Sequence, residues 1–407
     1  MDARMNDLRN IAERTLGACR KTERCAYYGD ERELPVFVPA GDGKYPSFWV
    51  RDCAMCATSG LMAMRDLRRY VEYVALCGQN GAHERRLING LSVPPYAVAD
   101  HINLNGRAVF FPGTYADGDD QGAGDYGMLP PLDDNYWFIL MAAQYVRQSG
   151  ERAILDAVYG GMTLADRLKR AWEGYCVDED GLCACRGERW AVDWGFCDSI
   201  RKSGRLLMPS LLRRQAALAL AELGLPGDWQ ARADAISRGI AAHLADPETG
   251  WLWSADGLCR QHDVWATACA AAWGALRGDT LRRARAALAE GLRTGAVAVD
   301  GYVRQLPLTD SPNCWESRGP GDEYQNGGYW STPVGWYAEA LWESEPELAC
   351  GLIDAFIAHT QRFAAQGAPF EWIDATTARF SGRLYGTSAA LPLEGCAHAA
   401  AARRARP

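Results

Sequence analysis

The sequence lacks the features that mark several common classes of protein. No apolar run reaches the roughly 18 residues that cross a membrane, and the first twenty residues lack the apolar stretch of a secretory signal. Basic residues are not in excess, because 51 acidic side chains against 43 basic ones give a net charge of −8. That balance argues against a nucleic acid or an anionic membrane as partner. We therefore expect a cytoplasmic protein that binds neither.

Histidine is scarce, with six residues in the chain, whereas cysteine is plentiful, with fourteen. A zinc site needs cysteine pairs or mixed Cys/His clusters at short spacings. The close pairs Cys53/Cys56 and Cys183/Cys185 have no histidine near them. We expect reduced, buried thiols, and we predict neither a metal nor an organic cofactor.

No linker rich in Pro, Gly and Ser divides the chain, so we predict a single domain over residues 1–407. Apolar residues recur at spacings of three and four nearly throughout, which indicates helices. The predicted helices lie at about 5–21, 49–64, 66–79, 133–149, 151–173, 206–223, 228–244, 262–277, 279–293, 330–343, 345–366 and 384–401. Twelve helices pair into about six hairpins, and six hairpins can close into a double-layered ring. The predicted fold class is all-α, an (α/α)6 barrel with short strands and long loops at one end.

Two stretches, 90–132 and 295–329, do not follow the helical pattern and are rich in Gly, Asp, Tyr and Pro. Long loops in a compact domain are usually functional, so we expect the site there. The chain also holds 15 Trp and 17 Tyr against 10 Phe. Trp and Tyr combine an apolar face with a polar edge, and a sugar ring has the same combination. Carbohydrate is therefore a candidate ligand.

The segment FWVRDCAM places Trp49, Arg51 and Asp52 at the start of a predicted helix. An acidic residue there can simply favour the helix dipole. An Arg–Asp pair beside a Trp also suits the binding of sugar hydroxyls. We take these three residues as substrate-binding candidates.

The segment PPLDDNYW places Asp133 and Asp134 before another predicted helix, and Asp125 precedes them in the loop. The pair can be an N-cap and its neighbour. A carboxyl buried beside Trp and Tyr can instead have a raised pKa, which a general acid needs. Asp133 and Asp134 are therefore candidates for a general acid, and Asp125 is a competing candidate.

Two further aromatic segments supply candidates for binding. In ERWAVDWGFCDS, Asp193 and Trp194 lie in an aromatic run, where a buried Asp binds either backbone amides or a ligand. In YQNGGYW, Gln325 and Asn326 offer amides and Trp330 offers an aromatic face. A Gly-Gly turn that leads into a packed helix is the plainer explanation of the second segment.

In PFEWIDATT, Glu371 lies between Phe370 and Trp372, which favours a carboxylate that faces a cleft. In a closed ring of hairpins, Glu371 and Asp133 can face each other across the mouth. A separation of about 6.5–9.5 Å between two such carboxyls predicts an inverting glycosidase, and about 5–5.5 Å a retaining one.

Four segments resemble, in order, motifs of the six-hairpin glycosidases, and most closely those of the neutral/alkaline invertases and the α-glucosidase I family. FWVRD at 48–52 is similar to F-x-x-R-D, and PLDDNYW at 131–137 is similar to P-V-D-S-G-x-W-W. YQNGGYW at 324–330 resembles Y-x-N-G-G-x-W, and FEWID at 370–374 resembles P-E-Y-Y-D.

This resemblance implies an (α/α)6 barrel and a glycoside hydrolase that acts on a small oligosaccharide or glycoside by inversion. It implies Asp133 as general acid and Glu371 as second catalytic carboxylate. The middle of the chain does not reproduce the invertase pattern, so sucrose is not implied. In the α-glucosidase I pattern the acid precedes a Pro-Pro-Leu-like run, which would favour Asp125.

Three alternatives remain open on the same barrel. A sugar 2-epimerase would use histidines, of which His101, His262 and His359 lie near predicted loop ends or helix faces. A polysaccharide lyase would need a Tyr or His base with an Asn or Arg partner. A non-catalytic carbohydrate-binding protein would keep the ring without the chemistry.

Overall fold

A computed structural model of the protein describes residues 2–27, 30–114, 121, 126–175, 177–185, 190–317, 324–374 and 379–404. Its helices are α1 (Asp2–Cys19), α2 (Val50–Ala57), α3 (Met64–Tyr73), α4 (Asp134–Ser149), α5 (Leu164–Glu173), α6 (Leu207–Glu222), α7 (Trp229–His243), α8 (Val264–Ala272), α9 (Gly278–Arg293), α10 (Val334–Leu341), α11 (Pro346–Arg362) and α12 (Gly386–Arg404). Each of the twelve predicted helical ranges overlaps one of these helices.

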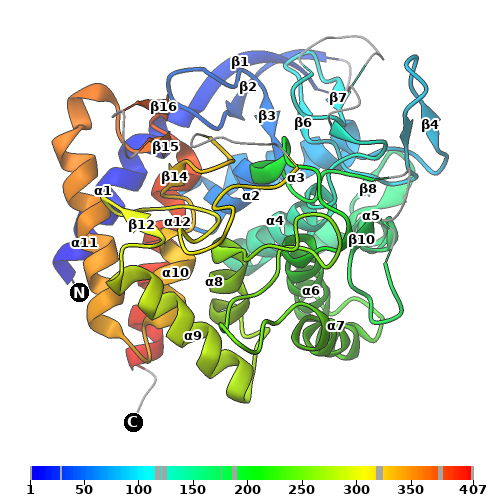
Figure 1. Ribbon diagram of the computed structural model, residues 1–407. Coiled ribbons are helices and arrows are strands. Elements are labelled where there is room, and N and C mark those ends of the chain that lie inside the picture. Colours follow the sequence, from blue (N-terminus) through cyan, green and yellow to red (C-terminus); the bar gives the residue numbers. More distant parts are fainter. Residues whose placement is uncertain are drawn as a thin grey trace.

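The helices form two concentric rings (Figure 1). Helices α2, α4, α6, α8, α10 and α12 make the inner ring, in which each contacts the next and α12 contacts α2. Helices α1, α3, α5, α7, α9 and α11 pack outside, and α1 packs on α12 and α11. The chain therefore alternates between outer and inner helices, which is the predicted (α/α)6 barrel.

Burial explains which helices lie inside. The inner helix α8, VWATACAAA, buries residues on every side from Val264 to Ala271. The outer helix α9 buries only a stripe that includes Ala284, Ala287 and Leu288, and it exposes Arg282, Arg283 and Arg293. A helix that is apolar on every side belongs in a core, and an amphipathic helix belongs on a surface.

Most of the strands are short, and β5, β6, β7, β12 and β13 lie in the two stretches, 90–132 and 295–329, that do not follow the helical pattern. The antiparallel strand pairs are β1 (Arg20–Tyr27) with β2 (Asp30–Phe37), β4 (Arg85–Arg86) with β5 (Ser92–Val93), β8 (Val158–Tyr159) with β9 (Met162–Thr163), and β10 (Ala184–Cys185) with β11 (Gly204–Arg205). A three-stranded antiparallel sheet joins β3 (Phe48–Trp49), β6 (His101–Ile102) and β7 (Ala108–Val109). A five-stranded antiparallel sheet joins β12 (Ala298–Val299), β13 (Tyr302–Val303), β14 (Tyr329–Trp330), β15 (Phe370–Ile373) and β16 (Phe380–Arg383).

These two larger sheets position the site. Figure 1 shows β3, β6, β7 and β14–β16 in the upper part of the view, above α6, α8 and α10. Strand β3 leads directly into the inner helix α2, and β16 is soon followed by the inner helix α12. Across the described ranges, no helix combines the length and the apolar character that a membrane crossing requires.

Candidate active site

A cavity of about 480 Å³ lies at the end of the ring where the two larger sheets meet. Its walls come from segments far apart in the chain, and aromatic and ionisable side chains dominate them. The lining residues are Pro39, Lys44, Tyr45, Trp49, Arg51, Asp52, Gly113, Tyr126, Gly195, Phe196, Asp198, Ser199, Tyr324, Trp330, Glu371, Trp372, Ser381 and Tyr385.

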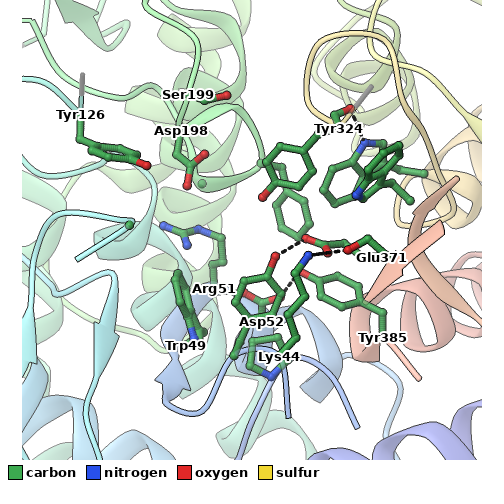
Figure 2. Close-up of a pocket in the computed structure, with 18 residues that line it drawn as sticks. Lys44, Trp49, Arg51, Asp52, Tyr126, Asp198, Ser199, Tyr324, Glu371 and Tyr385 are labelled. Carbon is green, nitrogen blue, oxygen red and sulfur yellow. Dashed lines mark hydrogen bonds and ion pairs between the residues drawn. The ribbon is translucent and has the colours of Figure 1, made fainter. Parts of the chain in front are cut away.

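Three carboxyl groups face this cavity from different elements (Figure 2). Asp52 lies in the first turn of α2, Asp198 follows a 3-10 turn at Gly195–Cys197, and Glu371 lies on β15. Desolvation raises the pKa of Asp52 and of Asp198 to about 7, and it also raises the pKa of Glu371. The charge of Glu371 adds to the shifts at both aspartates. Titrating carboxyls that share a cavity are typical of acid–base sites.

Two donors contact the carboxyl group of Glu371. The Tyr45 hydroxyl donates to Oε1 at 2.6 Å, and the Lys44 ammonium donates to Oε2 at 2.6 Å. Gly382 on β16 has a positive φ of 61°, and a Cβ there would lie 2.5 Å from the Glu371 Cβ. Only glycine combines that conformation with that space, so the neighbouring strand is shaped around the Glu371 side chain.

Asp198 has a neutral donor instead. The Gln325 amide donates from Nε2 to Asp198 Oδ1 at 2.6 Å, while Gln325 Oε1 accepts from the Ser199 backbone N–H at 2.9 Å. A backbone N–H can only donate, so the Ser199 contact fixes the orientation of the amide. Asp198 is half-buried, and its side chain points toward the cavity (Figure 2).

Arg51 lines the cavity and is bound from behind by a cluster of buried carboxylates. Its Nε donates to Asp133 at 2.9 Å, and its Nη2 donates to Asp100 and to Asp134, each at 2.6 Å. Burial, reinforced by the neighbouring carboxylates and opposed by Arg51, raises the pKa of Asp134 well above its ordinary value. The cluster holds the guanidinium in one orientation beside Asp52.

The Arg51 guanidinium also supports the segment that carries Asp198. A Cβ on Gly195 would lie 2.0 Å from Arg51 Cζ and 2.1 Å from Arg51 Nε, so the glycine backbone rests directly on the guanidinium. The Gly195 backbone N–H donates to Asp133 Oδ2 at 3.3 Å. Asp133 therefore helps to position Asp198.

Aromatic rings form the remaining walls. Trp49 stacks on His101 at 4.4 Å between ring centroids and meets Tyr45 edge-on at 5.5 Å. Trp330 contacts Tyr324 at 5.4 Å and Phe196 at 5.5 Å. Rings fixed by other rings provide rigid apolar surfaces of the kind that suits sugar C–H faces.

Five of the ten residues predicted for the site line the cavity: Trp49, Arg51, Asp52, Trp330 and Glu371.

The other five lie behind it. Asp133 is buried against Arg51, so the carboxyl predicted as general acid is not among the lining residues. Asp193 pairs with the buried Lys202 at 2.8 Å. Trp194 is a buried core residue, Asn326 accepts from the Trp315 backbone N–H at 2.5 Å, and Gln325 contacts Asp198.

The two alternatives to Asp133 have different outcomes. Asp134 is buried in the Arg51 cluster. Asp125 lies outside the described residues.

Asp198, Lys44, Tyr45 and Tyr385 also line the cavity and were not predicted from the sequence. Asp198 lies in the same segment, ERWAVDWGFCDS, from which Asp193 was selected. The available signal was Gly195, three residues before Asp198, because a glycine can mark a place where the backbone closely approaches another group, here Arg51. Lys44 and Tyr45 come just before FWVRD, where an aromatic and a cation close to a predicted site carried a signal that was not used.

The three histidines considered for an epimerase lie outside the lining residues. His101 is buried between Asp100 and Trp49, and His262 bridges Asp246 and Asp310 at 3.0 and 2.8 Å. His359 packs on Tyr302 in the core, where burial lowers its pKa to about 4. Among the described lining residues there is no histidine, so the geometry does not support histidine chemistry here.

No family model matches the sequence, and no curated protein is similar to it in sequence. Solved structures are similar in fold. A GH63 mannosylglycerate hydrolase from Thermus thermophilus in complex with glucose has a TM-score of 0.59 at 15% identity, over 94% of this chain and 99% of that chain. A glucoamylase from Saccharomycopsis fibuligera has a TM-score of 0.56 at 12% identity, over 97% and 95%.

A rhamnosidase from Klebsiella oxytoca with rhamnose bound has a TM-score of 0.58 at 14% identity, over 98% of this chain and 64% of that chain. By name these neighbours are a mannosylglycerate hydrolase, a glucoamylase and a rhamnosidase, and the chain shares their fold. At identities this low the likeness establishes the fold alone.

Proposed function

We propose that this (α/α)6-barrel protein is a glycoside hydrolase that acts on a small oligosaccharide or glycoside with inversion. The observation that carries the proposal is a pair of carboxyls, Asp198 and Glu371, that face one cavity with opposite hydrogen-bond environments. The fold shared with glycosidases supports the same reaction class. A cavity of about 480 Å³ suits a ligand of this size.

Asp198 is the proposed general acid, in place of Asp133. A general acid must carry a proton at the working pH, and desolvation raises the pKa of Asp198 to about 7. Its donor, the Gln325 amide, is neutral and occupies Oδ1, which leaves Oδ2 for the proton. Asp198 gives this proton to the glycosidic oxygen as the bond from that oxygen to the anomeric carbon breaks.

Glu371 is the proposed general base. An ammonium and a hydroxyl donate to its two oxygens, and both contacts favour the ionised form. Glu371 takes a proton from a water whose oxygen attacks the anomeric carbon on the face opposite the leaving group. The products are a free sugar of inverted configuration and the alcohol or sugar that left.

Arg51 and Asp52 are proposed to bind sugar hydroxyls at the cavity floor. Asp52 accepts from the Tyr385 hydroxyl at 3.0 Å, and Arg51 is fixed by the cluster behind it. Trp49 and Trp330 supply the aromatic faces. Together they would bind the ring on which the two catalytic carboxyls act.

The test is a hydrolysis screen with purified protein. The panel contains aryl α-glucosides, α-mannosides and α-rhamnosides together with sucrose, trehalose and mannosylglycerate. Proton NMR of the first-formed sugar distinguishes inversion from retention. We expect release of one sugar with inverted configuration. Sugar binding by calorimetry without any release would contradict the proposal and favour a binding protein.

A further inference from the structure

The ammonium group of Lys44 binds Glu371 and a neighbour of Glu371 on the adjacent strand. The ammonium donates to Glu371 Oε2 at 2.6 Å and to Ser381 Oγ at 2.7 Å. Glu371 and Ser381 lie on the paired strands β15 and β16, so the ammonium joins the loop before β3 to this hairpin. The Lys44 side chain is 36% exposed, whereas the Glu371 side chain is 1% exposed.

Lys44 is therefore a cation in direct contact with the carboxyl group of Glu371. Burial of that group opposes its ionisation. Burial raises the pKa of Glu371, and the Lys44 charge and the Tyr45 hydroxyl act in the opposite direction. The ammonium also lies 4.9 Å from the Tyr45 ring centroid and 5.8 Å from that of Tyr324. Both rings help to hold it beside Glu371.

The groups that face Glu371 come from every element around it and are mostly acidic or neutral. They are Asp42, Lys44 and Tyr45 from the loop before β3, Asp52 from α2, Asp198 from the segment after the 3-10 turn, Ser381 from β16, and Tyr324 and Tyr385 from the adjoining loops. Asp42 disfavours a negative charge on Glu371, and the charge of Glu371 in turn raises the pKa of Asp52 and of Asp198. Lys44 supplies the positive charge that opposes the burial of Glu371 and the charge of Asp42.

We propose that Lys44 is a positioning residue that keeps the Glu371 carboxylate ionised and aimed into the cavity, and so extends hydrolysis to lower pH. The inference rests on the proposed role of Glu371 as general base. An opposite charge at this distance lowers a carboxyl pKa by about 1–3 units, and partial exposure of Lys44 places the effect at the lower end of that range.

The chain offers matched variants. Lys44→Met removes the charge and keeps most of the length, and Lys44→Arg restores the charge. Lys21 is the control, because its ammonium donates to the Gly41 carbonyl at 3.0 Å and supports the same loop without touching Glu371. Ser381→Ala removes only the second acceptor of the Lys44 ammonium.

The first measurement is the pH dependence of kcat/KM for a substrate found in the screen. We expect Lys44→Met to move the acidic limb upward by about 1–2 pH units. Lys44→Arg and Lys21→Met are expected to keep it near the wild-type position, and Ser381→Ala to move it by less than Lys44→Met. An acidic limb that stays in place in an active Lys44→Met variant would overturn the inference and leave the proposed function standing.

The second measurement does not depend on activity. Carbon-13 NMR of protein labelled at the Glu side-chain carboxyl follows the titration of Glu371, whose resonance is identified by its loss in Glu371→Gln. An upward shift of that titration in Lys44→Met supports the ion-pair account even where no substrate is hydrolysed, in which case only the proposed function fails. An unchanged titration overturns the inference.

Discussion

Replacement of Gly195 by alanine tests how Arg51 positions the segment that carries Asp198. The new Cβ would lie 2.0 Å from Arg51 Cζ, 2.1 Å from Nε and 2.4 Å from Nη1, whereas ordinary contacts begin near 3.4 Å. Arg51 is anchored by three carboxylates and cannot move far. The backbone around residue 195 must therefore retreat by about 1.4 Å, the difference between the two distances.

A displacement of about 1 Å at a catalytic group can cost on the order of 100-fold in rate. Overpacking of this kind costs about 1–3 kcal/mol of stability. We expect Gly195→Ala to remain folded and to lose about 100-fold in kcat, measured with the substrate from the screen and checked by thermal unfolding. Gly351→Ala on α11 is the control, since nothing lies within 4 Å of its added Cβ. A Gly195→Ala enzyme with wild-type kcat would refute the reasoning.

Three further predictions follow from the same contacts. Because Asp198 must be protonated to act and its pKa is about 7, kcat/KM is expected to fall as pH rises through about 7, and a flat profile from about pH 6 to 9 would argue against this acid. Gln325→Glu places a second carboxyl against Asp198, so the alkaline limb of the same profile should move upward; a downward shift would contradict the contact. Lys202→Met leaves Asp193 buried without its cation and should lower the free energy of unfolding, measured by urea denaturation, by about 3–5 kcal/mol. The double variant Lys202→Met/Asp193→Asn should lose less. Equal losses in the single and double variants would show that the two side chains do not couple.

The fold was predictable because its signal is local. Helical periodicity and turn residues identified twelve ranges, and each overlaps a helix of the structure. The range 151–173 shows the limit. It contains a short 3-10 helix at Arg152–Asp156 and the strands β8 and β9 before α5 begins at Leu164. Helix boundaries depend on such short-range contacts, which periodicity does not resolve.

The site was predictable in part. Trp49, Arg51, Asp52 and Glu371, which line the cavity, were predicted because aromatic and charged residues stand together in the sequence. The choice of acid depends on distances across the ring. Asp133 and Asp198 both lie in aromatic segments that contain Gly or Pro. Only the tertiary structure shows that Asp133 is bound by Arg51 and that Asp198 lines the cavity.

Lys44 illustrates a contact that no local pattern reveals. Its partner Glu371 is 327 residues away in the chain and reaches it only when α12 closes the inner ring on α2. A lysine in a polar loop is ordinarily a solvated surface residue. Its place just before FWVRD puts it near the predicted site, but nothing local in the sequence indicates that its partner is Glu371.

The most direct test of the central claim compares Asp198→Asn, Asp133→Asn and Glu371→Gln on two aryl glycosides of the same sugar. One has a good leaving group, dinitrophenol, and the other a poor one, such as methylphenol. A good leaving group departs without protonation, so loss of the true general acid slows only the poor substrate, by roughly the 10²–10⁴-fold typical of acid catalysis. We predict that pattern for Asp198→Asn, a large loss on both substrates for Glu371→Gln, and for Asp133→Asn a loss that is the same on both substrates. Leaving-group dependence in Asp133→Asn, and none in Asp198→Asn, would contradict the account.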